Sequence, residues 1–304
     1  MSYPEDGWHS QHLPVILRNK EAQRASLKLS LTVSMGLPLV LEEIVINIKK
    51  QYQQSPEITW HTAQPTEEDL QILKREALHE NQFDKVNFKK QMWDAFQAGD
   101  AELLCKVCTY GKVLVIKLRN TNLSWSLWGR ILQGFGVPPT TRICWYAHPQ
   151  LRELPAPGID VGAEHVNGGY TVPCRTDAIV IYRLEEATRV LIHELLHAMC
   201  TDAPGLPIEL MEAKTETYAE LFLVGYCSRG SLRLAEKLWE KQRNWIHQVN
   251  TTLSVDHGVN TLEDYSARYT VARRAELERL GISLPVGGSK RTRSTRFTSK
   301  EIHF

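Results

Sequence analysis

The segment from His193 to His197 carries the residue types and the spacing of a metal-dependent hydrolase. On a helix, residues four positions apart lie on one face, so both imidazoles can reach a single metal ion. Glu194 follows the first histidine and can reach a water molecule beside that ion as general base. The five residues, HELLH, match the HExxH zinc pattern, which predicts Zn²⁺ held by His193 and His197.

A catalytic zinc site needs a third protein ligand and one position left for water. The next predicted helix offers Glu212, Glu216 and Glu220 at four-residue steps, which places the three carboxylates on one helix face. Glu216 is the predicted ligand and Glu212 the alternative. Glu220, or Glu212 if it is not the ligand, is expected to accept the free N–H of a ligand histidine. Asp202 is a less favoured ligand, because it follows His197 so closely that the chain would have to fold back.

Both patterns have a plain structural alternative. A row of glutamates that includes Lys214 is commonly a solvated helix face, and two histidines beside Val190 and Leu195 could simply be packed in a core. A buried Glu194 would then have neither purpose nor partner, at a cost in free energy. The combination of HExxH with a following row of carboxylates therefore favours a metal site.

The elements around this segment follow from apolar patterning and from breaks at glycine and proline. Helices are predicted over 67–79, 88–104, 122–134, 185–200, 208–226, 231–253 and 261–280, with a mixed pattern over 26–53 that is strand-like at first and helix-like later. Strands are predicted over 112–118, 143–148, 165–174 and 178–183. Strands followed by a largely helical C-terminal part indicate an α+β fold.

The strand predicted over 165–174, HVNGGYTVPC, is the best candidate for a sheet edge beside the histidine helix. Gly168 and Gly169 would let a substrate backbone approach closely, and an edge strand can hold an extended peptide through backbone hydrogen bonds. The alternative is a hairpin turn at Asn167–Gly168. Hydrolysis also needs a donor for the oxyanion. We predict His257 for this role, ahead of His165, His247, Tyr170, Tyr218, Tyr265 and Tyr269.

HELLH followed by KTETYAEL resembles the gluzincin class of zinc metallopeptidases, in which a glutamate of the next helix completes the site. The resemblance covers residues 165–228 and implies a zincin-like fold with His193, His197 and Glu216 as ligands and Glu194 as base. The same region is similar to metallopeptidase-like proteins predicted in large DNA viruses. Thr215 and Thr217 depart from the Asn-Glu-Gly of many aminopeptidases in the class. The chain also has no GAMEN-like exopeptidase motif, so we expect an endopeptidase that acts on peptides or proteins.

Composition is that of a globular protein: 42% of the 304 residues are hydrophobic and the net charge is +1, so the whole chain does not indicate nucleic-acid or membrane binding. We expect an N-terminal region over 1–110, a zincin-like domain over 111–284 and a basic, disordered tail over 285–304. The chain shows no signal peptide, and its six cysteines are dispersed. These features predict reduced thiols and an intracellular location.

Two other functions fit parts of the sequence. The tail carries five basic residues and could bind nucleic acid through phosphates: Lys290, Arg291, Arg293, Arg296 and Lys300. SprT-like DNA-associated proteases also use HExxH, but they take a third histidine shortly afterwards, and this chain has none between His197 and His247. The other alternative is a non-catalytic interaction protein that retains a zincin fold.

Overall fold

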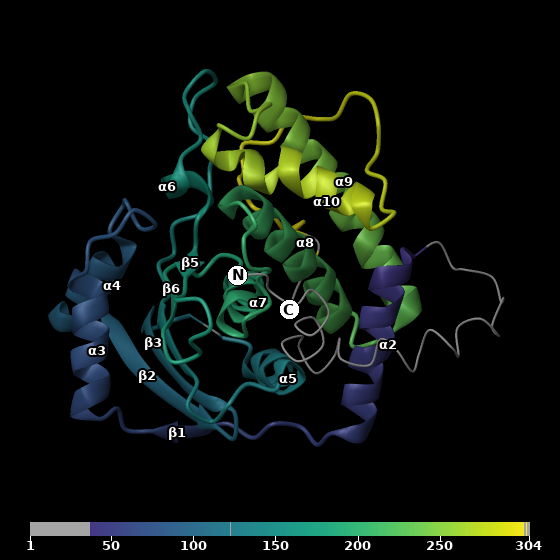
Figure 1. Ribbon diagram of the computed structural model, residues 1–304. Coiled ribbons are helices and arrows are strands. Elements are labelled where there is room, and N and C mark those ends of the chain that lie inside the picture. Colours follow the sequence, from purple (N-terminus) through teal and green to yellow (C-terminus); the bar gives the residue numbers. More distant parts are fainter. Residues whose placement is uncertain (1–36, 122, 301, 303–304) are drawn as a thin grey trace, which may run out of the picture.

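A mixed sheet of six strands forms the centre of the protein, with helices on both faces (Figure 1). The structure is a computed structural model that describes residues 37–121, 123–300 and 302. The strand order is β1-β2-β3-β4-β6-β5. The strands are β1 (His61–Ala63), β2 (Ala101–Cys108), β3 (Gly111–Leu118), β4 (Arg142–Tyr146), β5 (Gly169–Tyr170) and β6 (Ile179–Ile181). β3, β4 and β6 run parallel, whereas β1, β2 and β5 join antiparallel.

The continuous apolar runs of the central strands are explained by burial on both faces. Successive side chains of a strand point to opposite sides, and β3 follows this rule. Val113 and Val115 join the cluster formed with α2, α5, α7 and α8, whereas Leu114 and Ile116 join the cluster beneath α3 and α4. These helices are α2 (Leu39–Gln54), α3 (Glu67–Leu78), α4 (Phe88–Ala98), α5 (Trp125–Phe135), α7 (Ala187–Ala198) and α8 (Ile208–Cys227).

The predicted helix over 88–104 ends earlier than expected. Gly99 adopts a left-handed conformation with φ of 85° and closes α4, after which the chain reverses and forms β2. Cys105 and Cys108 lie on this strand as buried free thiols, in agreement with the reduced state expected for them. The helix-like pattern within 26–53 is confirmed by α2. Its earlier strand-like part, over residues 27–33, lies outside the described residues.

The C-terminal part is helical, as predicted, and packs on the α7 side of the sheet (Figure 1). It adds α9 (Leu232–His257), the short helix η2 (Tyr265–Tyr269) and α10 (Val271–Arg279), while α6 (Ala163–Val166) precedes β5. The single helix expected over 261–280 is divided at Thr270, whose φ of −130° and ψ of −81° are not helical. The strand expected from residue 165 begins only at Gly169, because α6 occupies its first positions.

The predicted division at residue 110 falls between β2 and β3, which pair along their whole length from Ala101–Leu118 to Cys108–Gly111. The N-terminal region that the structure describes therefore shares one sheet with the rest. The tail also differs from the expected disorder: Thr295, Phe297 and Thr298 are buried. Arg296, predicted to be available to phosphates, instead lies 3.1 Å from Glu185.

No helix among the described residues is both long and apolar enough to cross a bilayer.

Candidate metal centre

Helix α7 carries the HELLH residues, and every one of its twelve residues is buried. It starts shortly after β6, packs through Val190, Leu191 and Leu195 into the main core, and lies between the sheet and α8. His193, Glu194 and His197 are only 5–8% exposed. Three ionisable side chains buried on an apolar helix are costly unless they are paired or bind a ligand, so their surroundings decide what they do.

Helix α8 brings Glu212 to the two imidazoles. The Nε2 atoms of His193 and His197 lie 3.2 Å apart. Glu212 Oε2 is 3.3 Å from Nε2 of His193, and Glu212 Oε1 is 3.8 Å from Nε2 of His197. One donor atom from each of the three residues lies within 4.8 Å of the others. His193, His197 and Glu212 therefore form a buried group that could hold a metal ion.

Glu216, the predicted ligand, lies behind the His193 ring. Its Oε2 is 2.9 Å from Nδ1 of His193, on the far side from Nε2, and its Oε1 accepts a hydrogen bond from Arg189. The three carboxylates do share a helix face, but α8 is placed one turn away from the expected register. Glu212 thus takes the place predicted for Glu216, and Glu216 takes the supporting place.

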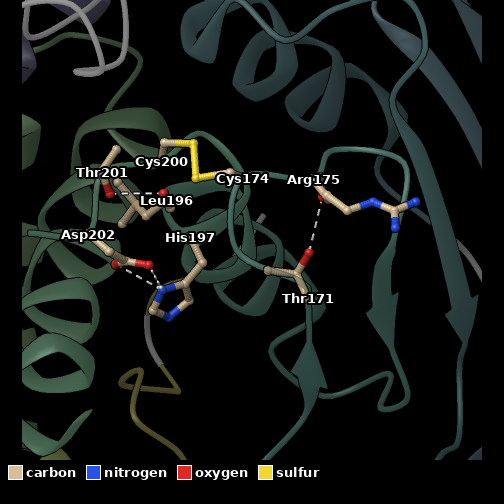
Figure 2. Close-up of a disulfide and its surroundings, with 8 residues drawn as sticks. All are labelled: Thr171, Cys174, Arg175, Leu196, His197, Cys200, Thr201 and Asp202. Atoms are coloured by element: carbon tan, nitrogen blue, oxygen red, sulfur yellow. Dashed lines mark hydrogen bonds and ion pairs between the residues drawn. A yellow bond between two sulfur atoms is a disulfide. The ribbon is translucent and has the colours of Figure 1, made fainter. Parts of the chain in front are cut away.

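The other supporting carboxylate comes from the loop after α7. Asp202 Oδ2 lies 2.9 Å from Nδ1 of His197, and Figure 2 shows the carboxylate facing this edge of the ring. The chain does fold back here, but it brings Asp202 to Nδ1 of His197 and not to the Nε2 atoms that face Glu212. Glu220, predicted to support a histidine, is instead bound by Arg273 at 2.6 Å and by Gln242 at 3.2 Å.

The environment separates the two histidines electrostatically. Burial lowers the pKa of His193 to about 4. Burial acts in the same direction on His197, but the Asp202 carboxylate at Nδ1 and the nearby Glu212 carboxylate outweigh it and raise the pKa of His197 to about 10. Burial opposes ionisation of Glu212, yet its contacts with the two histidines hold the pKa of this carboxyl well below its usual range. The centre thus favours a negative Glu212 beside a positive charge.

Glu194 lies beside the group on α7, and burial raises its pKa to about 8. The edge strand β5 passes next to it. A Cβ atom on Gly169 would lie 3.2 Å from Glu194 Oε1, 2.6 Å from Val190 Cγ1 and 2.8 Å from the carbonyl oxygen of Val180. Glycine is therefore required here because β5 packs directly on α7. The expected edge position is confirmed, since β5 pairs with β6 at one end of the strand order.

The candidate oxyanion donors are placed differently from expectation. His257 ends α9, and its Nδ1 lies 3.0 Å from the carbonyl oxygen of Ile159 rather than against the group. The Tyr170 hydroxyl faces the opposite layer, where it is 2.8 Å from Lys89 Nζ. For Tyr265, burial raises the pKa of the hydroxyl, and the Glu212 carboxylate acts in the same direction. Its hydroxyl donates to Asn167 Oδ1 at 3.0 Å, just before β5.

A disulfide joins Cys174, in the loop between β5 and β6, to Cys200, just after α7 (Figure 2). The Cys174 amide also donates to the carbonyl oxygen of His197 at 3.1 Å. The expectation of reduced thiols is therefore wrong for this pair and holds for Cys105, Cys108, Cys144 and Cys227, which are free. Because disulfides persist mainly in oxidising compartments, the cysteine argument for an intracellular location no longer applies.

Arg189 is a residue of this site that the sequence interpretation did not identify. It precedes His193 by four positions and His197 by eight, so spacing alone places it on the same helix face. A buried arginine requires a carboxylate partner, and the only acidic row on the next helix was already assigned to zinc. A buried Arg189 and a zinc site both need carboxylates from the same row. This competition could have indicated that one of those glutamates pairs with Arg189.

Comparison of the chain with known proteins found no matching protein-family model, no matching curated protein and no matching solved structure.

Proposed function

We propose that this protein is a zinc-dependent endopeptidase of gluzincin type, with His193, His197 and Glu212 as the metal ligands and Glu194 as the general base. The observation that carries this proposal is the convergence of two imidazoles and a carboxylate from two packed helices, with a second buried carboxylate beside them. A packed core would not bring four ionisable side chains together without a further partner.

The donor set fits zinc. Two imidazole nitrogens and one carboxylate leave one position free in a tetrahedral site. Two nitrogens each about 2.1 Å from a tetrahedral ion are roughly 3.4 Å apart, and the two Nε2 atoms are separated by 3.2 Å. The carboxylates of Glu216 and Asp202 at the two Nδ1 atoms would hold each ring with Nε2 directed at the ion.

Zinc bound by this group supplies Lewis-acid chemistry, polarising a carbonyl and lowering the pKa of water toward neutrality. Glu194 accepts a proton from the attacking water and passes it to the leaving amine, a task suited to a pKa near the working pH. β5 offers its unpaired edge to an extended peptide beside Glu194. Tyr265 replaces His257 as our candidate donor to the carbonyl oxygen.

The test is metal content followed by peptide hydrolysis on the purified chain. The wild-type protein should bind one zinc ion per chain and cleave an unstructured protein substrate such as casein. Glu194→Gln should retain zinc and lose hydrolysis by at least about 100-fold, as expected for loss of a general base. His197→Ala should lose the metal. A wild-type chain that binds no zinc, or a Glu194→Gln chain that hydrolyses casein normally, would exclude the proposal.

A further inference from the structure

Residues 294–300 form a segment, here called the strap, that lies against the start of α7 and against α9. Within it, Thr295, Phe297, Thr298 and Ser299 are buried. Phe297, at its centre, is only 1% exposed. The strap was expected to be disordered because its sequence, STRFTSK, is polar and basic. Its burial next to the helix that carries the histidines raises the question of what it contributes there.

The strap is held through its backbone. Glu186, the residue just before α7, accepts hydrogen bonds from the amides of Phe297, at 3.1 Å, and Thr298, at 2.5 Å. Gln242 of α9 donates to the carbonyl oxygen of Phe297 at 2.6 Å and accepts from the amide of Ser299 at 2.9 Å. Both partners are buried. Such charge-assisted and buried bonds fix the position of the Phe297 ring.

Three arginines surround that ring. The guanidinium carbons of Arg189, Arg273 and Arg152 lie 4.7, 5.6 and 5.7 Å from its centroid. An aromatic face attracts a cation, and the attraction is stronger when both are removed from water. The ring therefore gives each of the three like charges a favourable neighbour.

Arg189 connects this cage to the metal centre. It donates to Glu216, whose other oxygen lies 2.9 Å from Nδ1 of His193. On its other side, Arg189 Nε is 3.8 Å from Glu186, the residue that holds the strap. The guanidinium is thus held between the strap and the carboxylate behind a ligand histidine.

We propose that the strap is a positioning element of the metal centre and that Phe297 is its positioning residue. Phe297 holds Arg189 in the orientation in which it fixes Glu216, and Glu216 in turn fixes the His193 ring. For its effect on the metal, this inference rests on the proposed function. It assigns to a segment remote in sequence a role in metal affinity that packing alone would not provide.

A double-mutant cycle on zinc affinity tests this inference in the full-length protein. Phe297→Ala should weaken zinc binding by about tenfold, within the range for partners of ligand histidines. Glu216→Gln should weaken it at least as much, and the double variant should be no weaker than Glu216→Gln alone, because both act through one carboxylate. Losses that multiply, or a Phe297→Ala chain with wild-type affinity, would overturn the proposal.

Two further measurements separate positioning from loss of folding. Phe297→Leu keeps most of the apolar volume and replaces the alanine variant if that one does not fold. Met92→Ala removes buried volume from the cluster beneath α4, outside the strap's contacts, and should leave zinc affinity unchanged. The ¹⁵N shifts of the His193 ring in zinc-free protein should move in the Phe297 variants and not in Met92→Ala. Unmoved shifts refute the strap inference, whereas absence of zinc from wild-type protein refutes only the proposed function.

Discussion

The two ends of α7 are both rich in buried charge, but they balance it differently. Near its start, each arginine faces a carboxylate: Arg152 with Glu186, Arg189 with Glu216, and Arg273 with Glu220. Near its end, Glu194, Glu212 and Asp202 gather around two imidazoles, and no lysine or arginine of the described chain forms an ion pair with them. In the first region each of these arginines has a negative partner, so we call the region complete. The second, incomplete region is balanced only if it gains positive charge from a proton or a metal ion.

Removing a charge from the complete region should produce the largest effect. Arg189→Met leaves Glu216 buried without its cationic partner, so we expect the free energy of unfolding to fall by about 3–5 kcal/mol. Arg175→Met is the matched control, because Arg175 pairs with Asp177 at the surface with 57% of its side chain exposed. The control should lose less than about 1 kcal/mol. Urea unfolding of both variants measures the two losses of unfolding free energy. Equal losses would show that the buried pair contributes no more than a surface pair.

Exchanging Glu212, in the incomplete region, should change metal binding more than exchanging Glu216, which belongs to the complete region. Glu212→Gln should weaken zinc binding by more than about 100-fold because a ligand is lost, and Glu216→Gln by about 10–100-fold because only its support is lost. Glu209→Gln, one turn earlier on α8 and 3.9 Å from Arg268, should bind zinc normally. Competition titrations with a chelator give the order. If Glu216→Gln binds zinc more weakly than Glu212→Gln, then Glu216 is the third ligand, as predicted from the sequence.

The smallest expected effect is a dependence of zinc affinity on pH. His197 keeps its proton up to pH about 10 in the zinc-free protein, so zinc must displace this proton at neutral pH. Affinity should therefore rise by up to about tenfold per pH unit from pH 7. The same proton stabilises the zinc-free fold below pH about 6.5, and that contribution is lost as the pH rises through about 10. Titrations at pH 7, 8 and 9 measure the slope, and a flat profile would contradict a charged His197.

The elements were predictable where local chemistry decides them. The helix expected over 185–200 is seen as Ala187–Ala198, and the one expected over 208–226 as Ile208–Cys227, because apolar spacing and the break at Pro204 and Gly205 are local properties. The paired histidines follow from the same local spacing. The contribution of an acid from α8 was foreseen, since helices joined by a short loop pack together.

Which acid contributes was not predictable, because Glu212, Glu216 and Glu220 are equivalent by spacing. Their roles are set by the register of α8 on α7, which depends on packing along both helices. The pairing of Arg189 with Glu216 and the burial of Phe297 depend on contacts between distant segments. The spacing of apolar residues along the chain does not report such contacts. For the same reason, six dispersed cysteines gave no indication that Cys174 and Cys200 meet.

The disulfide closes a loop of the chain that contains several residues of the candidate metal centre. Between Cys174 and Cys200 run β6 and the whole of α7, including both histidines and Glu194. The backbone there is a covalently closed ring, so one cut at any point within it leaves the two new ends attached to the same molecule. For a protein that we propose cleaves peptide bonds, a single self-inflicted nick in this ring would not release the residues that perform the cleavage.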